Sequence, residues 1–132
     1  MLSFKQLNVN PKGRKTGDCS TRAIAYCLGI TWEEALKLQY EESLKTKYDL
    51  TSRQVMERVL AKFGYVKRKQ PRTVDNLKYC IYDMDKVVSL EERERRIVCN
   101  VANHYVVLDG HEYVDTWNSG CKCCGNYFVK ED

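Results

Sequence analysis

The sequence lacks any apolar run of about 18 residues, the length that a membrane-spanning helix requires. Its opening segment, MLSFKQLNVNPKGRK, also lacks the apolar core of a secretory signal peptide. It contains no internal repeat, low-complexity tract or linker, and 132 residues is an ordinary length for one domain. We therefore expect a single domain over residues 1–132, no membrane partner and a cytoplasmic location.

The sequence also lacks a strong excess of either charge. Its 22 Lys and Arg against 18 Asp and Glu give a net charge of +4. The basic residues are scattered, as at 12–15 and 67–69, and the nine tyrosines do not alternate with them. We expect solvated basic side chains, tyrosines in or near the core, and no nucleic-acid partner.

Cysteine is abundant, with seven residues, an odd number that cannot all pair within the chain. In a reducing compartment they should be thiols that are buried, catalytic or bound to metal. Cys121, Cys123 and Cys124 could bind zinc with a fourth ligand from elsewhere. The candidates for that ligand are Cys80, Cys99 and His111. Because the spacing is not the paired C-x₂-C of common zinc sites, we expect a loop with incidental thiols, no metal and no cofactor.

Helical periodicity dominates the first half of the chain. The predicted helices run from Cys19 to Gly29, from a capping box at Thr31 to about residue 45, from a second capping box at Thr51 to Gly64, and over residues 74–82. We expect residues 1–17 to be extended or irregular because Pro11 and two glycines interrupt them.

The pattern changes to strands near residue 96. Four strands are predicted, over residues 96–101, 103–108, 111–117 and 125–130, and Asp109-Gly110 is a strong hairpin signal. Helices followed by an antiparallel sheet of about four strands indicate an α+β domain.

The hairpin brings a histidine to an aspartate. With Asp109-Gly110 as a two-residue turn, His104 lies opposite Asp115, with Cβ atoms roughly 4.5–5.5 Å apart. Trp117 lies on the same face and could shield the pair from water. A slip of the strands or a bulge would instead bring Asn118 to the imidazole. The alternative to a functional pair is a surface His–Asp contact.

Cys19 lies at the first turn of a predicted helix, where the helix dipole favours a thiolate. Asp18 is a candidate N-cap whose charge opposes that thiolate, and Arg22 can neutralise it. A cysteine hydrolase needs a thiolate, an imidazole, a group that orients the imidazole and donors for the oxyanion. The alternative is a buried structural cysteine, which is how we interpret Cys27.

These segments together resemble a known family. Gly17-Asp18-Cys19 with Arg22-Ala23, His104-Tyr105-Val106-Val107 and Asp115-Thr116-Trp117 resembles a group of short papain-like proteins that bacteriophages and mobile elements often encode. Residues 126–130 are similar to the closing strand of papain-like peptidases. The resemblance spans about residues 8–130 and implies a minimal papain-like fold, a Cys19-His104-Asp115 triad and action in a bacterial host.

The chain departs from that family in two places. Gly13 stands about where papain-like enzymes carry the glutamine that completes the oxyanion hole, so Asn8 or Asn10 is the candidate amide. Ser20 stands where papain has an aromatic residue after the nucleophile. The chain is also much shorter than papain, so the walls of the substrate site must be minimal or come from a partner.

We therefore expect a cysteine peptidase or isopeptidase that cleaves an amide bond of a protein or peptide through a thioester. A deamidase or acyltransferase would use the same three groups. The competing class is a papain-like binding or inhibitor protein in which the thiol is idle. The sequence carries no signal for the oligomeric state.

Overall fold

The computed structural model describes residues 1–15 and 17–131. The elements in chain order are β1 (Ser3–Gln6), α1 (Cys19–Leu28), α2 (Trp32–Thr46), α3 (Arg53–Ala61), β2 (Tyr65–Arg68), the 3₁₀ helix η1 (Ile81–Lys86), α4 (Leu90–Glu94), β3 (Ile97–Val101), β4 (His104–Asp109), β5 (Glu112–Asp115) and β6 (Tyr127–Lys130). The predicted α+β class is confirmed.

The sheet differs from the expected one. It has six strands in the order β1-β5-β4-β3-β6-β2. β1 pairs with β5 in parallel, and the other pairs are antiparallel. The sequence pattern missed β1 and β2, because each is a four-residue strand at one edge of the sheet, too short for periodicity to stand out.

Helix ends follow the predicted local signals. Gly29 takes a left-handed conformation with φ of 67° after α1, and Thr31 forms a complete capping box with Glu34 at the start of α2. Ser52, rather than the predicted Thr51, caps α3. The predicted helix over residues 74–82 is wrong, because Val74 and Leu77 are exposed and a turn closes there; the helices of this region are η1 and α4.

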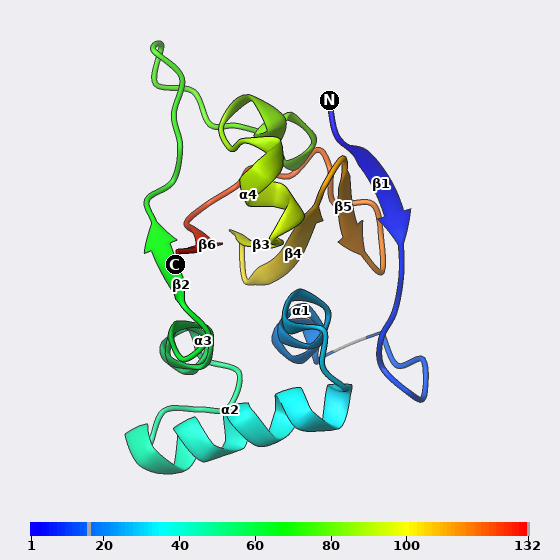
Figure 1. The fold of residues 1–132 in the computed structure, drawn as a ribbon, viewed down its shortest axis with the longest axis vertical. Helices are drawn as coiled ribbons and strands as arrows, with labels where there is room; N and C mark the ends of the chain where they lie inside the picture. The colour runs from blue at the N-terminus through cyan, green and yellow to red at the C-terminus, as the bar shows by residue number, and fades with distance from the viewer. Residues whose placement is uncertain (16, 132) are drawn as a thin grey trace.

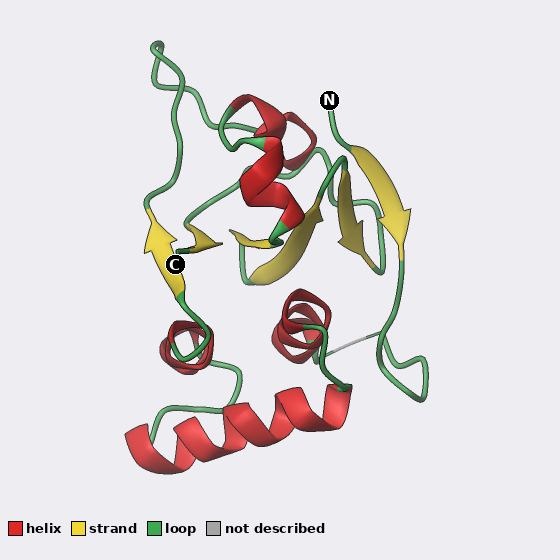
Figure 2. Ribbon diagram, in the orientation of Figure 1, coloured by secondary structure: helices red, strands yellow, loops and turns green. Residues whose placement is uncertain are grey.

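The helices cover both faces of the sheet (Figures 1 and 2). α1 and α3 lie against one face with α2 beneath them, while η1 and α4 lie on the other. Each face of the sheet has its own hydrophobic core, and side chains of β4 alternate between them. Tyr105 and Val107 belong to the core on the α1 side, and Val106 and Leu108 belong to the core on the η1 side.

The β4–β5 hairpin turns one residue later than predicted. Its turn residues are Gly110 and His111, and the side chain of His111 is exposed. The paired residues are Asp109 with Glu112, Leu108 with Tyr113, and Val107 with Val114. The predicted direct opposition of His104 and Asp115 is therefore wrong by two residues. A shift of two preserves the alternation of side chains between the faces, so it does not separate the two groups.

Candidate active site

Cys19 is the first residue of α1, at the position where the sequence predicts the helix to begin. Gly17 turns the chain into the helix with φ of 80°, a left-handed conformation that favours glycine. The Cys19 thiol lies 3.9 Å from the backbone carbonyl of Asn103 and can donate to it. The N–H of Cys19 is in the first turn, so no helical carbonyl accepts from it.

His104 is placed by a tight turn between β3 and β4. Val101 pairs with His104, and the two residues between them, Ala102 and Asn103, have φ of 42° and 68°. Positive φ at both central positions is the geometry of a type I′ hairpin turn. An alanine in this region carries backbone strain, which proteins tend to keep at functional sites.

The predicted contact between His104 and Asp115 is confirmed. Nε2 of His104 lies 2.7 Å from Oδ2 of Asp115. Asp115 is almost fully buried, and it also accepts hydrogen bonds from the backbone N–H of Thr116 and the hydroxyl of Ser119, each at 2.7 Å. These bonds fix the carboxylate, so it can hold the imidazole in one orientation.

Ser119 is a site residue that the sequence did not reveal. Its side chain is fully buried and its hydroxyl shares Oδ2 of Asp115 with the imidazole. It lies four residues after Asp115, outside any strand, so neither helical nor strand periodicity predicts this contact.

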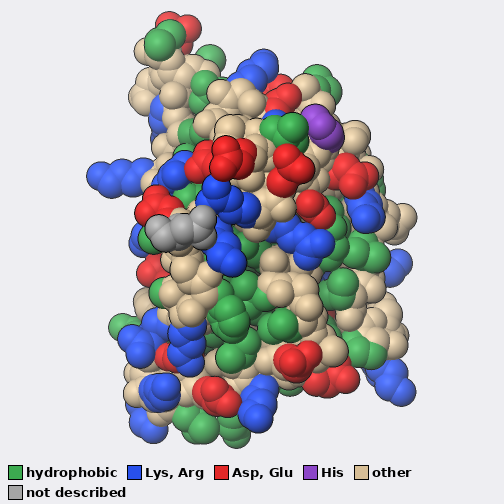
Figure 3. All heavy atoms as spheres, viewed as in Figure 1, with side chains coloured by type: hydrophobic (Ala, Val, Ile, Leu, Met, Phe, Trp, Pro, Cys, Tyr) green, Lys and Arg blue, Asp and Glu red, His purple; other side chains and the backbone are tan. Residues whose placement is uncertain are grey.

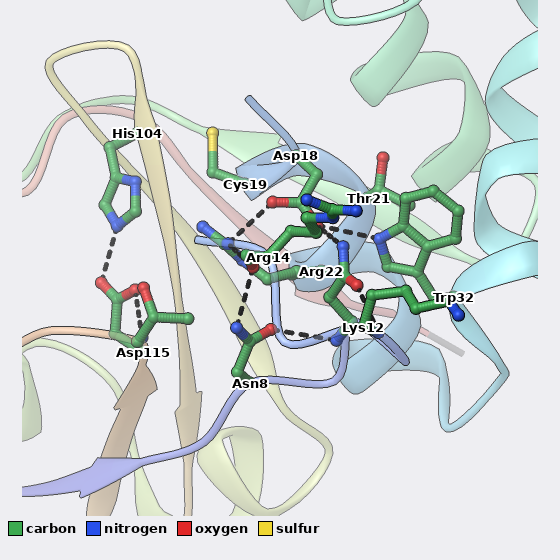
Figure 4. A network of polar contacts seen from close by, with 12 residues as sticks. Asn8, Lys12, Arg14, Asp18, Cys19, Thr21, Arg22, Trp32, His104 and Asp115 are labelled. Carbon is green, nitrogen blue, oxygen red and sulfur yellow. Dashed lines mark hydrogen bonds and ion pairs between the residues drawn. The ribbon is translucent and has the colours of Figure 1, made fainter. Parts of the chain in front are cut away.

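Cys19 and His104 face each other on the side of the ring away from Asp115 (Figure 4). Burial opposes ionisation of the thiol, but a hydrogen bond from His104 and its positive charge outweigh burial and lower the pKa of Cys19. A hydrogen bond with the Tyr105 backbone and the charge of Arg22 act in the same direction. The thiol is thus biased toward the thiolate, the nucleophilic form.

The pKa of the His104 imidazole is shifted in the opposite direction, upward. Burial favours neutral His104, but its hydrogen bonds with Asp115 and Cys19, and their charges, raise its pKa to about 9. Both shifts favour the thiolate–imidazolium form of the pair over the neutral form. Trp117 packs its ring 5.0 Å from the imidazole, as predicted, while remaining 44% exposed at the mouth of the site.

Asp18 does not use its side chain to cap α1. Its carboxylate instead forms an ion pair with Arg22 at 2.7 Å, the neutralisation that the sequence predicts. It also accepts hydrogen bonds from the amide of Asn10 at 2.8 Å and the indole of Trp32 at 3.0 Å. Asp18 therefore organises the loop before Cys19 (Figure 4).

The side-chain amides of Asn8 and Asn10, the two candidates for the oxyanion hole, donate hydrogen bonds to other groups. Asn8 donates to the backbone carbonyl of Arg14 at 2.8 Å, and Asn10 donates to Asp18. Both side chains hold the loop that precedes α1, so we do not assign them to the oxyanion. Asn118, the rival partner for the imidazole, accepts from the Tyr113 hydroxyl at 2.8 Å instead.

A cleft of about 550 Å³ opens onto the reacting groups. Cys19, His104 and Trp117 line it together with Arg53 and Asn103. The described residues contain no group of three or more His, Cys, Asp or Glu side chains placed to hold a metal ion.

No family model, curated protein or solved structure matches this chain. Among the helices of the described residues, none is long and apolar enough to cross a membrane. The geometry of the site therefore carries the functional argument.

Proposed function

We propose that this protein is a cysteine hydrolase that cleaves an amide bond of a protein or peptide through a thioester on Cys19. The observation that carries the proposal is the series of polar contacts from the Cys19 thiol through His104 to the buried Asp115. An idle surface thiol has no need of an imidazole partner that is itself fixed by a buried carboxylate.

The reaction begins with attack of the Cys19 thiolate on the substrate carbonyl carbon, which forms a C–S bond. The backbone N–H of Cys19 donates to the resulting oxyanion. His104 then gives its proton to the leaving amine as the C–N bond breaks.

Water next attacks the thioester while His104 accepts its proton, and the Cys19 thiolate leaves. Asp115 accepts the hydrogen bond of the imidazolium and stabilises its charge.

The papain-like relationship is part of this proposal. It is supported by the chain order of the three groups, with the cysteine opening α1, the histidine opening β4 and the aspartate ending β5. From the resemblance of its motifs to short phage and mobile-element proteins, we also propose that the protein has such an origin and acts in the cytoplasm of a bacterial host.

Digestion of a peptide library by the protein and by its Cys19→Ala and His104→Ala variants tests the proposal. Mass spectrometry of new amino termini should show cleavage by the native protein and none by either variant. Conversion of glutamine to glutamate without cleavage would make the protein a deamidase. Cleavage that survives in Cys19→Ala would overturn the assignment, and absence of any reaction would favour a binding protein.

A further inference from the structure

The cleft onto which Cys19, His104 and Trp117 open is lined by charged side chains of one sign. The 550 Å³ cleft adjoins a cavity of about 390 Å³, and the two share Arg53, Asn100 and Asn103. We call the two together the basic cleft. Its cationic side chains are Lys15, Arg22, Arg53, Lys78 and Lys122. No Asp or Glu lines either cavity in the part of the chain that the structure describes.

The excess of cationic over acidic side chains in the basic cleft is not found over the whole surface. The face in Figure 3 intersperses Lys and Arg with Asp and Glu. In a neighbouring cavity Lys67 forms an ion pair with Glu57 at 2.8 Å. Within the basic cleft, Arg22 is neutralised by Asp18.

Arg53 has the central position. It is the first residue of α3, its side chain is exposed, and it lines both parts of the basic cleft. A guanidinium binds a carboxylate through two parallel hydrogen bonds, which gives direction as well as affinity.

We propose that the substrate is an acidic peptide and that Arg53 binds the carboxylate of an Asp or Glu near the amide that Cys19 attacks. This inference rests on the proposed function. A nucleic acid would also be attracted to the basic cleft, but its phosphodiester backbone offers no amide carbonyl to the thiolate. The reacting groups therefore favour a peptide.

Two alkylating agents of nearly equal size separate charge recognition from nucleophilicity. Iodoacetate is an anion and iodoacetamide is neutral, and both alkylate a thiolate. The ratio of their rates at Cys19 should fall about threefold or more in Arg53→Gln because a cation is removed, and should recover in Arg53→Lys. Added salt should lower the ratio in the native protein toward that of Arg53→Gln.

Lys37→Gln provides the matched control, since it removes the same charge from an exposed site on α2 outside the basic cleft. It should leave the ratio within measurement error. An unchanged ratio in Arg53→Gln overturns the acidic-peptide proposal while leaving Cys19 as nucleophile. Slow alkylation of Cys19 by both agents instead counts against the proposed function.

Competition then distinguishes peptide from nucleic acid. An oligoglutamate peptide should protect Cys19 from iodoacetamide more strongly in the native protein than in Arg53→Gln. Stronger protection by a single-stranded oligonucleotide of equal charge would contradict the choice of a peptide.

A second observation concerns cysteines that the reaction does not use. Cys80 and Cys123 face each other on an isolated antiparallel bridge. The flanking bonds run from the N–H of Ile81 to the carbonyl of Lys122 at 2.9 Å, and from the N–H of Cys124 to the carbonyl of Tyr79 at 2.8 Å.

That pattern makes Cys80 and Cys123 a non-hydrogen-bonded pair, for which Cα atoms lie about 4.5 Å apart with side chains on one face. The separation falls within the range of about 4.4–6.8 Å that disulfides occupy. Cys123 is exposed and Cys80 is half-buried, so a small oxidant can reach them.

We infer that Cys80 and Cys123 form a dithiol that a low-molecular-weight disulfide oxidises. One thiolate attacks a sulfur of that disulfide and releases a first thiol. The second thiolate attacks the resulting mixed disulfide and releases a second thiol. The protein loses two hydrogen atoms, and the small disulfide is reduced to two thiols.

Oxidation of the Cys19→Ser variant with glutathione disulfide tests this inference without interference from the nucleophile. Tryptic mapping should recover residues 79–86 joined to residues 123–130, and fragmentation should place the bond on Cys123. The cross-link should disappear in Cys123→Ser and persist in Cys121→Ser, the matched control. A bond from Cys99 to Cys124, or glutathione adducts alone, would overturn the inference.

Discussion

At the scale of single residues, the site depends on how three side chains share protons. Asp115 keeps its carboxylate on the imidazole of His104, and His104 in turn stabilises the Cys19 thiolate. A free thiol has a higher pKa than a free imidazole. In this site the two pKa values shift toward each other, because that of Cys19 is lowered and that of His104 is raised. Since the groups interact closely, measured pKa values belong to the pair.

Turnover should therefore follow a bell-shaped pH profile. It should rise as Cys19 ionises below its ordinary pKa, and fall as His104 loses its proton near pH 9. Asp115→Asn removes a charge that raises the pKa of His104, so the alkaline limb should move to lower pH. An alkaline limb that stays in place in this variant would contradict the role of Asp115.

Asp115 and Asn118 offer a direct comparison of two possible orienting groups. Asp115→Ala should lower kcat about 10²–10⁴-fold, because the imidazole loses the partner that fixes its tautomer. Asn118→Ala removes only a contact with Tyr113 and the N–H of Gly120, so its kcat should change less than about threefold. Steady-state kinetics of both variants distinguish these roles, and an equal loss in the two would refute the assignment.

At the scale of elements, local chemistry predicted the helix that carries the nucleophile, but not every strand. Asp18, Cys19 and Gly29 lie within a few residues of the ends of α1, so their spacing in sequence reports its bounds. β1 reaches its place only by pairing with β5, more than 100 residues later, and no local pattern carries that information.

The β4–β5 hairpin shows the same difference between local sequence signals and long-range packing. Asp109-Gly110 located the turn to within one residue, but the choice between turn residues depends on packing along β4 and β5. The predicted His104–Asp115 contact is still correct, because the strand register differs from the predicted one by two residues and both side chains stay on the same face of the sheet. Ser119 could not be found because its hydroxyl meets Asp115 only after the loop beyond β5 has folded back.

Glu42 joins α2 to α3 and supplies a test of their packing. Its side chain is only 1% exposed and contacts Arg58 at 2.7 Å and Lys62 at 2.6 Å. Hydrogen bonds from these two cations lower its pKa to about 2. A lowered folded pKa stabilises the protein above the unfolded pKa of about 4.3, and that contribution is lost as the pH falls toward 2.

Glu42→Gln should therefore lower the free energy of unfolding at pH 7, and the difference from the native protein should shrink as the pH falls from about 4.3 to 2. Glu41→Gln, the neighbouring substitution on α2, should have a smaller effect. Urea denaturation across this pH range measures both. A difference for Glu42→Gln that is independent of pH would contradict the ion-pair account.

At the scale of the whole molecule, residues near the chain's start complete the sheet that carries the site. Leu2 is 4% exposed and belongs to the core on the η1 side, and the N–H of Leu7 donates to the carbonyl of Asp115 at 3.0 Å. β1 thus supports the strand that presents the orienting carboxylate, where the sequence predicted only an extended or irregular segment.

Leu2→Ala should lower the free energy of unfolding by about 2–3 kcal/mol, because it removes buried methyl groups and leaves a cavity. Val74→Ala, at a fully exposed apolar residue, should change it by less than about 0.5 kcal/mol. Equal effects in a denaturation experiment would show that Leu2, the residue before β1, does not pack into the cooperative core.

Competitive alkylation at pH 6 shows whether Cys19 is an activated thiolate. With limiting iodoacetamide and quantification by mass spectrometry, Cys19 should be labelled at least tenfold faster than any of the other six cysteines, because its pKa is lowered. The advantage should be lost in His104→Ala. If native Cys19 is labelled no faster than the exposed Cys121 and Cys123, Cys19 is not the activated nucleophile.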